Sequence, residues 1–152
     1  MVTISEIYGV DKSDKNDIIK IGSDNVAEII KLGKIDIQPL EKEFGKLQTD
    51  EIIITNERIE HIKLRHHEDY ELFEKYGMST VQSPDVIIKD HKNKGTVFMV
   101  KKLTETNLNV VARLVLYDDN PNHINSVMTF YRIRNKNLIK LENRNKILYK
   151  RE

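Results

Sequence analysis

Histidine and arginine side chains are concentrated in one stretch of this chain, from Glu57 to His67. Three of the five histidines lie there, His61, His66 and His67, together with two arginines. An imidazole takes up and releases protons near neutral pH, and a guanidinium can hold a phosphate through paired hydrogen bonds. This stretch therefore predicts acid–base chemistry on a phosphodiester, of a kind that needs no metal ion.

A second polar cluster, between Asn125 and Arg134, falls on a predicted strand near the C-terminus. Internal cleavage of RNA requires a base for the 2′-hydroxyl, an acid for the leaving 5′-oxygen, and cations or donors for the charge that builds on the phosphate. If the 2′-hydroxyl is the nucleophile, the product is a 2′,3′-cyclic phosphate and DNA should resist cleavage. Besides the histidines, the residues expected to contact the phosphate or a base are Arg65, Arg113, Thr129, Tyr131, Arg132 and Arg134.

Several of these positions also have an ordinary structural explanation, which stays open at this point. Arg113 and Arg132 could simply be the water-facing positions of alternating strands. Thr129 is a good strand former, and a half-buried Tyr131 is common in a sheet. The structural explanation and the phosphate-binding explanation predict the same strands and differ only in the function that they give these side chains.

The three clustered histidines do not predict a metal site. Helical zinc ligands are normally spaced i, i+4, whereas His61 is five residues from His66 and six from His67. His67 could substitute as an acid or base, bind substrate, or only close the end of a helix, where its charge favours the helix dipole. No cofactor is expected.

The composition predicts one globular domain preceded by a short N-terminal extension: the chain has 152 residues, 39% hydrophobic and 32% charged. It has no cysteine, no apolar run near 18 residues and no leader-like start, which predicts a cytoplasmic protein without a membrane span. From residue 132 to the end, eight Lys and Arg accompany two Glu. This basic end predicts a surface for a phosphate backbone, or else only a solvated face.

Hydrophobic periodicity predicts two parts in the chain. Residues 1–48 are expected to form an accessory segment that is partly helical, with a helix that Ser23, Asp24 and Asn25 cap and Gly33 ends. Residues 49–152 are expected to form the main domain. Its predicted helices are residues 56–67, capped by Thr55 or Asn56, and a short one from residue 70 that Gly77 ends.

The rest of the main domain reads as strands. The predicted strands are residues 51–54, 86–89, 96–101, 108–117 and 125–134, with a hairpin turn at residues 93–95. The order of elements favours an α+β fold in which N-terminal helices pack on a roughly four-stranded antiparallel sheet.

The helix at residues 56–67 sets the directions of its histidines. Ile59, Ile62 and His66 fall within one narrow arc, so His66 is expected at the end of the core-facing side. At about 100° per residue, His61 lies about 140–160° from that arc. A straight helix cannot aim both rings at one point unless its C-terminal turn is distorted.

Several short motifs of this chain recur in the same order in a known family. They are Ile54 to Ile62, Arg65-His66, Glu68 to Tyr70, Pro84-Asp85, Asn125 to Phe130, Arg132-Ile133 and Asn145 to Lys150. In these motifs, over roughly residues 50–150, the chain resembles the phage-associated branch of the barnase–EndoU–colicin–RelE-like nuclease superfamily. The family usually has proline after the Arg-His pair, where this chain has His67.

The resemblance implies helices followed by an antiparallel sheet, and RNA cleavage without a metal. It carries the family's helical histidines onto His61 and His66 and its strand hydroxyl onto Thr129. We therefore expect a metal-independent endoribonuclease of phage or toxin type, with RNA as substrate and an immunity or antitoxin protein as partner. Two alternatives are a catalytically inactive nucleic-acid-binding or phage-assembly module with the same fold, and a protein-interaction domain.

Overall fold

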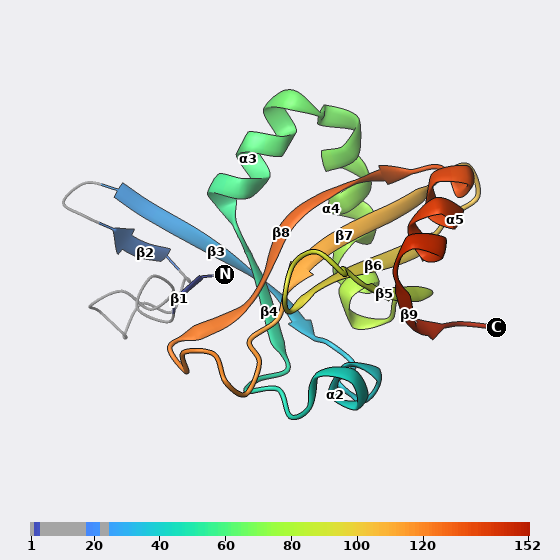
Figure 1. Cartoon of the computed structure of the whole chain (residues 1–152). Coiled ribbons are helices and arrows are strands. Elements are labelled where there is room, and N and C mark those ends of the chain that lie inside the picture. The colour runs from blue at the N-terminus through green and yellow to red at the C-terminus, as the bar shows by residue number, and fades with distance from the viewer. Residues whose placement is uncertain (1, 4–17, 22–24) are drawn as a thin grey trace.

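The computed structural model describes residues 2–3, 18–21 and 25–152 of the chain (Figure 1). Both helices and strands form in these residues, so the predicted α+β class is confirmed. The described helices are α2 (Gln38–Phe44), α3 (Asn56–Arg65), α4 (His67–Gln82) and α5 (Asn135–Arg144). The described strands are β1 (Val2–Thr3), β2 (Ile18–Ile21), β3 (Asn25–Lys34), β4 (Glu51–Thr55), β5 (Val86–Lys89), β6 (Thr96–Lys102), β7 (Asn107–Arg113), β8 (His123–Ile133) and β9 (Lys146–Lys150).

Among the described strands, seven form the central sheet in the order β3-β4-β8-β7-β6-β5-β9, with β2 added beside β3 and β1 paired with β8. The antiparallel meander from β5 to β8 is present as predicted. The expected size of four antiparallel strands is wrong, because β4 joins β8 in parallel and β9 adds to β5. The sheet is therefore mixed and wider than the meander alone.

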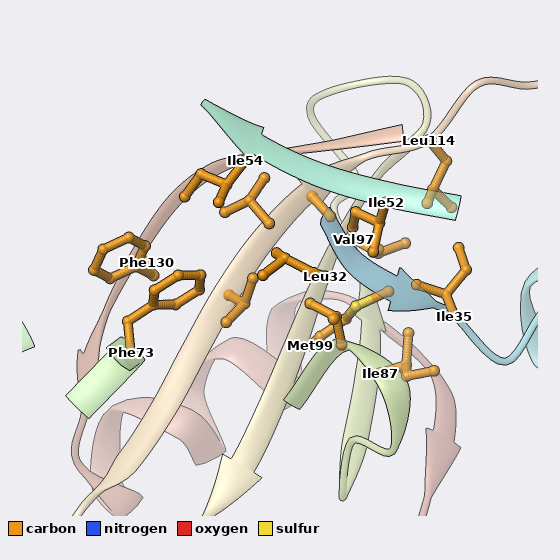
Figure 2. Close-up of a cluster of buried hydrophobic side chains, with 14 of the residues drawn as sticks. Leu32, Ile35, Ile52, Ile54, Phe73, Ile87, Val97, Met99, Leu114 and Phe130 are labelled. Atoms are coloured by element: carbon orange, nitrogen blue, oxygen red, sulfur yellow. The ribbon is translucent and has the colours of Figure 1, made fainter. Parts of the chain in front are cut away.

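Helices α3 and α4 cover one face of the sheet, over the main hydrophobic core. Figure 2 shows Phe73 of α4 lying against Phe130 of β8, with ring centroids 4.0 Å apart and nearly parallel planes. Leu32 of β3 and Ile54 of β4 belong to the same core. Aromatic stacking of this kind stabilises a core beyond the area that it buries.

Helix α5 packs on the opposite face of the sheet (Figure 1). Its buried Leu138 lies in a cluster with Val100 of β6 and Ile133 of β8. Side chains alternate between the two faces of a strand, so neighbours along β8 serve different layers. We call the surface covered by α3 and α4 the α4 face, and the other the α5 face.

The helix expected near residue 30 is wrong, because residues 25–34 form strand β3. Ile29 pairs with Thr55 and Ile30 with Ile54 of β4, so this segment belongs to the sheet. β-Branched side chains favour the pleated conformation, and tertiary pairing overrides an apparent helical spacing. The expected capping residues Ser23 and Asp24 lie outside the described residues.

Two elements of the C-terminal part differ in length from their predictions. Helix α4 runs from His67 to Gln82 and passes through Gly77, which was expected to end a short helix. A Cβ at Gly77 would lie 2.6–2.9 Å from atoms of the Phe73 ring, so this glycine makes room for the ring instead. Strand β7 ends at Arg113 rather than near residue 117.

The boundary expected at residue 48 falls between α2 and β4. On its N-terminal side, Leu32 of β3 and Leu40 of α2 are buried in the main core together with residues of β4 to β8. No helix in the described part of the chain is long and apolar enough to cross a membrane.

Candidate active site

Helix α3 begins where β4 ends, and its first turn is capped. The Thr55 Oγ accepts a hydrogen bond of 3.3 Å from the backbone N–H of Arg58, which confirms Thr55 as the cap. Ile59 and Ile62 are buried and fix the helix on the sheet. Arg58, His61 and Arg65, at spacings of three and four residues, therefore share one exposed side of α3.

A surface pocket lies at the start of α3. Thr55, Glu57, Arg58 and His61 line its volume of about 320 Å³. Glu57 and His61 are four residues apart and thus face the same way. The pocket combines a carboxylate and an imidazole with a guanidinium at the positive end of a helix dipole, and the last two favour a bound anion. We call these four residues the α3 pocket.

His66 was expected on the core-facing side of this helix, but it lies outside the helix, because α3 ends at Arg65. Its backbone leaves the helical conformation, with φ −140° and ψ 68°, and its side chain is exposed. Its carbonyl accepts hydrogen bonds of 3.1 Å from the N–H groups of both Asp69 and Tyr70, which start α4. His66 is the corner residue between two helices.

His67 is exposed on the first turn of α4. Its Nε2 lies 3.0 Å from Oε1 of Glu71, one turn further along the helix. Its ring centroid is 6.0 Å from that of Tyr70. A hydrogen bond with Glu74 raises the pKa of the Tyr70 hydroxyl above its usual value.

Arg132 joins the strand motif to the helix motif. Its Nε lies 2.7 Å from Oδ1 of Asp69, and its Nη1 lies 2.8 Å from Oε2 of Glu68. The hydrogen bond with Asp69 raises the pKa of the Arg132 guanidinium above its already high usual value, and Glu68 adds to this. The strand motif and the helix motif thus meet through Arg132, and both carboxylates neutralise the arginine that was expected to bind phosphate.

Thr129 lies on the α5 face, not with the histidines. Its neighbour Phe130 packs on α4, and successive side chains point to opposite faces. Tyr131 follows the same alternation and packs against the cluster under α5. Neither residue lines the α3 pocket. Arg134 caps the start of α5 through its backbone and has an exposed side chain.

Arg113 has a local role at the far end of β7. Its guanidinium donates to the carbonyl of Leu114 and lies 3.3 Å from the carboxylate of Asp119. Arg132 is level with Leu108, five residues away along β7 or about 17 Å. The structure therefore separates Arg113 from the other candidate residues.

The structure adds Thr55, Glu57 and Arg58 to the candidates, and the sequence held a clue to them. Glu57 and His61 have the i, i+4 spacing that places two side chains on one side of a helix. In the described residues, no group of three or more His, Asp and Glu side chains is arranged to hold a metal ion.

No protein-family model matches this chain, and no curated protein or solved structure is significantly similar to it.

Proposed function

We propose that the α3 pocket is the reaction centre of a metal-independent endoribonuclease of phage or toxin type, acting on RNA in the bacterial cytoplasm. The observation that carries this proposal is the convergence of Glu57, Arg58 and His61 on one solvent-accessible pocket. The resemblance of the surrounding motif to the barnase–EndoU–colicin–RelE-like superfamily supports the same activity.

The three side chains supply the groups that internal RNA cleavage needs. The Glu57 carboxylate takes the proton of the 2′-hydroxyl, whose oxygen attacks the adjacent phosphorus. The protonated His61 gives its proton to the 5′-oxygen as the P–O bond breaks, which leaves a 2′,3′-cyclic phosphate. Arg58 and the dipole of α3 stabilise the charge that develops on the non-bridging oxygens. A second proton transfer, in the reverse direction, can regenerate both groups.

Matched RNA and DNA strands test this proposal. In EDTA, we expect RNA to be cut to products with a 2′,3′-cyclic phosphate and DNA to stay intact. His61→Ala and Glu57→Gln should each lower kcat by a factor of about 10²–10⁴, as loss of an acid or base does. Glu60→Gln, on an exposed part of α3 outside the pocket, is the control and should change little.

A different result would remove the proposal. Equal activity of the His61→Ala and wild-type chains would show that the pocket is not the reaction centre. Activity that EDTA abolishes and a divalent ion restores would require a metal mechanism.

A catalytically inactive nucleic-acid-binding module is the second candidate. Two observations favour it: Arg132 is neutralised by Glu68 and Asp69, and Thr129 lies outside the pocket. This candidate predicts salt-sensitive RNA binding by a chain that leaves RNA uncut under every condition of the assay above.

A further inference from the structure

One buried side-chain amide on the α5 face, that of Asn109, lacks hydrogen-bond partners in the described residues. The Asn109 side chain is fully buried, and in the described part of the chain neither its Nδ2 nor its Oδ1 makes a hydrogen bond. An unpaired buried polar group costs about 1–3 kcal/mol, so native structures rarely keep one without a use.

Two other buried asparagines show what a structural role looks like in this protein. Asn107, two residues earlier on β7, donates to the Ile133 carbonyl and to Asn135 Oδ1, both at 2.9 Å. Asn125 accepts from one backbone N–H and donates to two carbonyls. Asn109 has none of these, and its cross-strand neighbours are Val100 and Tyr131. A trapped water would also find few polar partners among such neighbours.

Asn109 lies beside an open part of the sheet. In the next row of the α5 face, Phe98 of β6, Val111 of β7 and Thr129 of β8 are aligned across three strands. These three residues and Tyr131 are all partly exposed. We call these four residues the platform. It contains two aromatic rings, Phe98 on β6 and Tyr131 on β8, and the amide of Asn109 lies on β7 in the same cross-strand row as Tyr131.

Helix α5, beside the platform, has a basic solvent-facing side. Helix α5 covers the adjoining part of the same face and carries Lys136, Lys140 and Arg144 at successive i, i+4 positions. These side chains are exposed, and none has an acidic partner among the described residues. Cations spaced along a helix beside partly exposed aromatic rings suit a single nucleic-acid strand, whose bases stack while its phosphates are neutralised.

The strand that carries Thr129 is also the direct neighbour of the strand that leads into the α3 pocket. Ile52 pairs with Asn125 and Ile53 with Ser126 in the parallel ladder between β4 and β8, so Thr55 follows two residues after one end of this ladder and Thr129 three residues after the other. Neighbouring strands are about 4.8 Å apart. A strand of RNA that crosses the platform from α5 therefore runs toward the α3 pocket.

We propose that the platform binds unpaired bases of a single-stranded RNA and that the Asn109 amide reads one of them. This inference rests on the proposed function and names how its substrate is held. Tyr131, which is partly exposed and directly opposite Asn109, swings aside so that a base stacks on the aromatic surface and meets the amide. An amide offers a donor beside an acceptor, so it can form two hydrogen bonds with the edge of an unpaired base.

Binding to four homo-oligomers of 2′-O-methyl RNA tests the inference, because such strands lack the nucleophile and are not cut. Asn109→Leu should abolish the difference in affinity between the preferred oligomer and the others, a change of about tenfold. Its melting temperature should stay equal or rise, because leucine has no polar group to satisfy. Tyr131→Leu, which keeps an apolar filling, should weaken all four oligomers alike, by about tenfold, through lost stacking.

The control is Tyr117→Leu, which removes an exposed aromatic ring on the loop after β7, outside the platform. We expect it to change neither affinity nor base preference. An unchanged base preference in Asn109→Leu, or equal effects of Tyr131→Leu and Tyr117→Leu, would overturn the inference, as would absence of binding to any oligomer. Base-selective binding by a chain that cuts no RNA would instead uphold the inference and reject the cleavage proposal.

Discussion

At the scale of single residues, the structure assigns different tasks to side chains that the sequence made look alike. Arg113 and Arg132 both sit on strands near carboxylates, but Arg113 closes a local loop with Asp119 and Arg132 fastens the start of α4 to β8. The sequence predicted their residue type and strand placement. It could not predict their partners, because the contact between Arg132 and Asp69 spans 63 residues of chain.

The two adjacent histidines should contribute unequally to activity. We expect His66→Ala to lower the rate of RNA cleavage more than His67→Ala, because the His67 imidazole is engaged with Glu71. The side chain of His66 has no partner in the described residues and is free to meet a phosphate of the bound RNA. Cleavage rates of the two variants, with circular dichroism as the check of folding, measure the difference. A larger loss in His67→Ala would show that the family motif is shifted by one residue here.

Arg132 should matter for stability as well as for any substrate. The Asp69 carboxylate is buried, so Arg132→Met leaves it without its charged partner. We expect the free energy of unfolding to fall by about 1–3 kcal/mol, as for a buried acceptor that loses its donor. Arg134→Met, at an exposed position two residues later, is the control and should change it by less than about 0.5 kcal/mol. Urea denaturation measures both, and equal values would mean that the ion pair contributes no net stability.

At the scale of elements, local patterns succeeded where one face of an element decides its structure. The capped start of α3, the hairpin at Gly95 and the meander strands all follow from spacing and turn residues. The patterns failed where long-range pairing decides, as in β3, and where a glycine serves packing, as at Gly77 in α4. The same reason explains β9: it pairs with β5, almost sixty residues earlier, and its own composition reads only as a basic tail.

A methyl group at Gly77 tests the packing of α4. Alanine is the better helix former by about 1 kcal/mol. Its Cβ, however, would press on the Phe73 ring, which is stacked on Phe130, and such overpacking costs about 1–3 kcal/mol. We expect Gly77→Ala to lower the free energy of unfolding, while Lys75→Ala on the exposed side of α4 leaves it nearly unchanged. A more stable Gly77→Ala variant would mean that the aromatic stack can shift without cost.

At the scale of the whole molecule, the candidate residues that the sequence suggested for one site lie on two different faces of the sheet. The α4 face holds the core and the helices with the clustered histidines, and the α5 face holds the strand residues Thr129 and Tyr131. The sequence suggested one shared site for the two motifs and gave no sign that they lie on separate faces of the sheet. That separation follows from the pleat of β8 and from the parallel pairing of β4, neither of which a local pattern contains.

The basic helix should govern how salt affects RNA binding. Replacing Lys136, Lys140 and Arg144 of α5 with glutamate should lower the affinity for single-stranded RNA and flatten its salt dependence. Each lost phosphate contact removes about 0.7 from the slope of log affinity against log salt. Reversal of Lys42 and Lys46, near α2, is the control and should do little. Fluorescence anisotropy over a salt series measures both sets of variants. Equal losses of affinity would show that the basic side of α5 is only a solvated surface. Lys12 and Lys15, a second pair of control positions for charge reversal, lie outside the described residues.

The parallel pairing of β4 with β8 also sets an order of events during translation. Ile52 cannot pair with Asn125 until the ribosome has added about seventy further residues, which takes roughly 4–15 s at ordinary elongation rates. Glu57, Arg58 and His61 follow β4 directly, so until β8 has been synthesised the sheet holds their segment only through the pairing of β4 with β3. An incomplete nascent chain is therefore expected to carry no assembled pocket beside the messenger RNA that encodes it. A chain stopped before residue 123 should fail to protect α3 from proteolysis, and release of the full chain should restore protection.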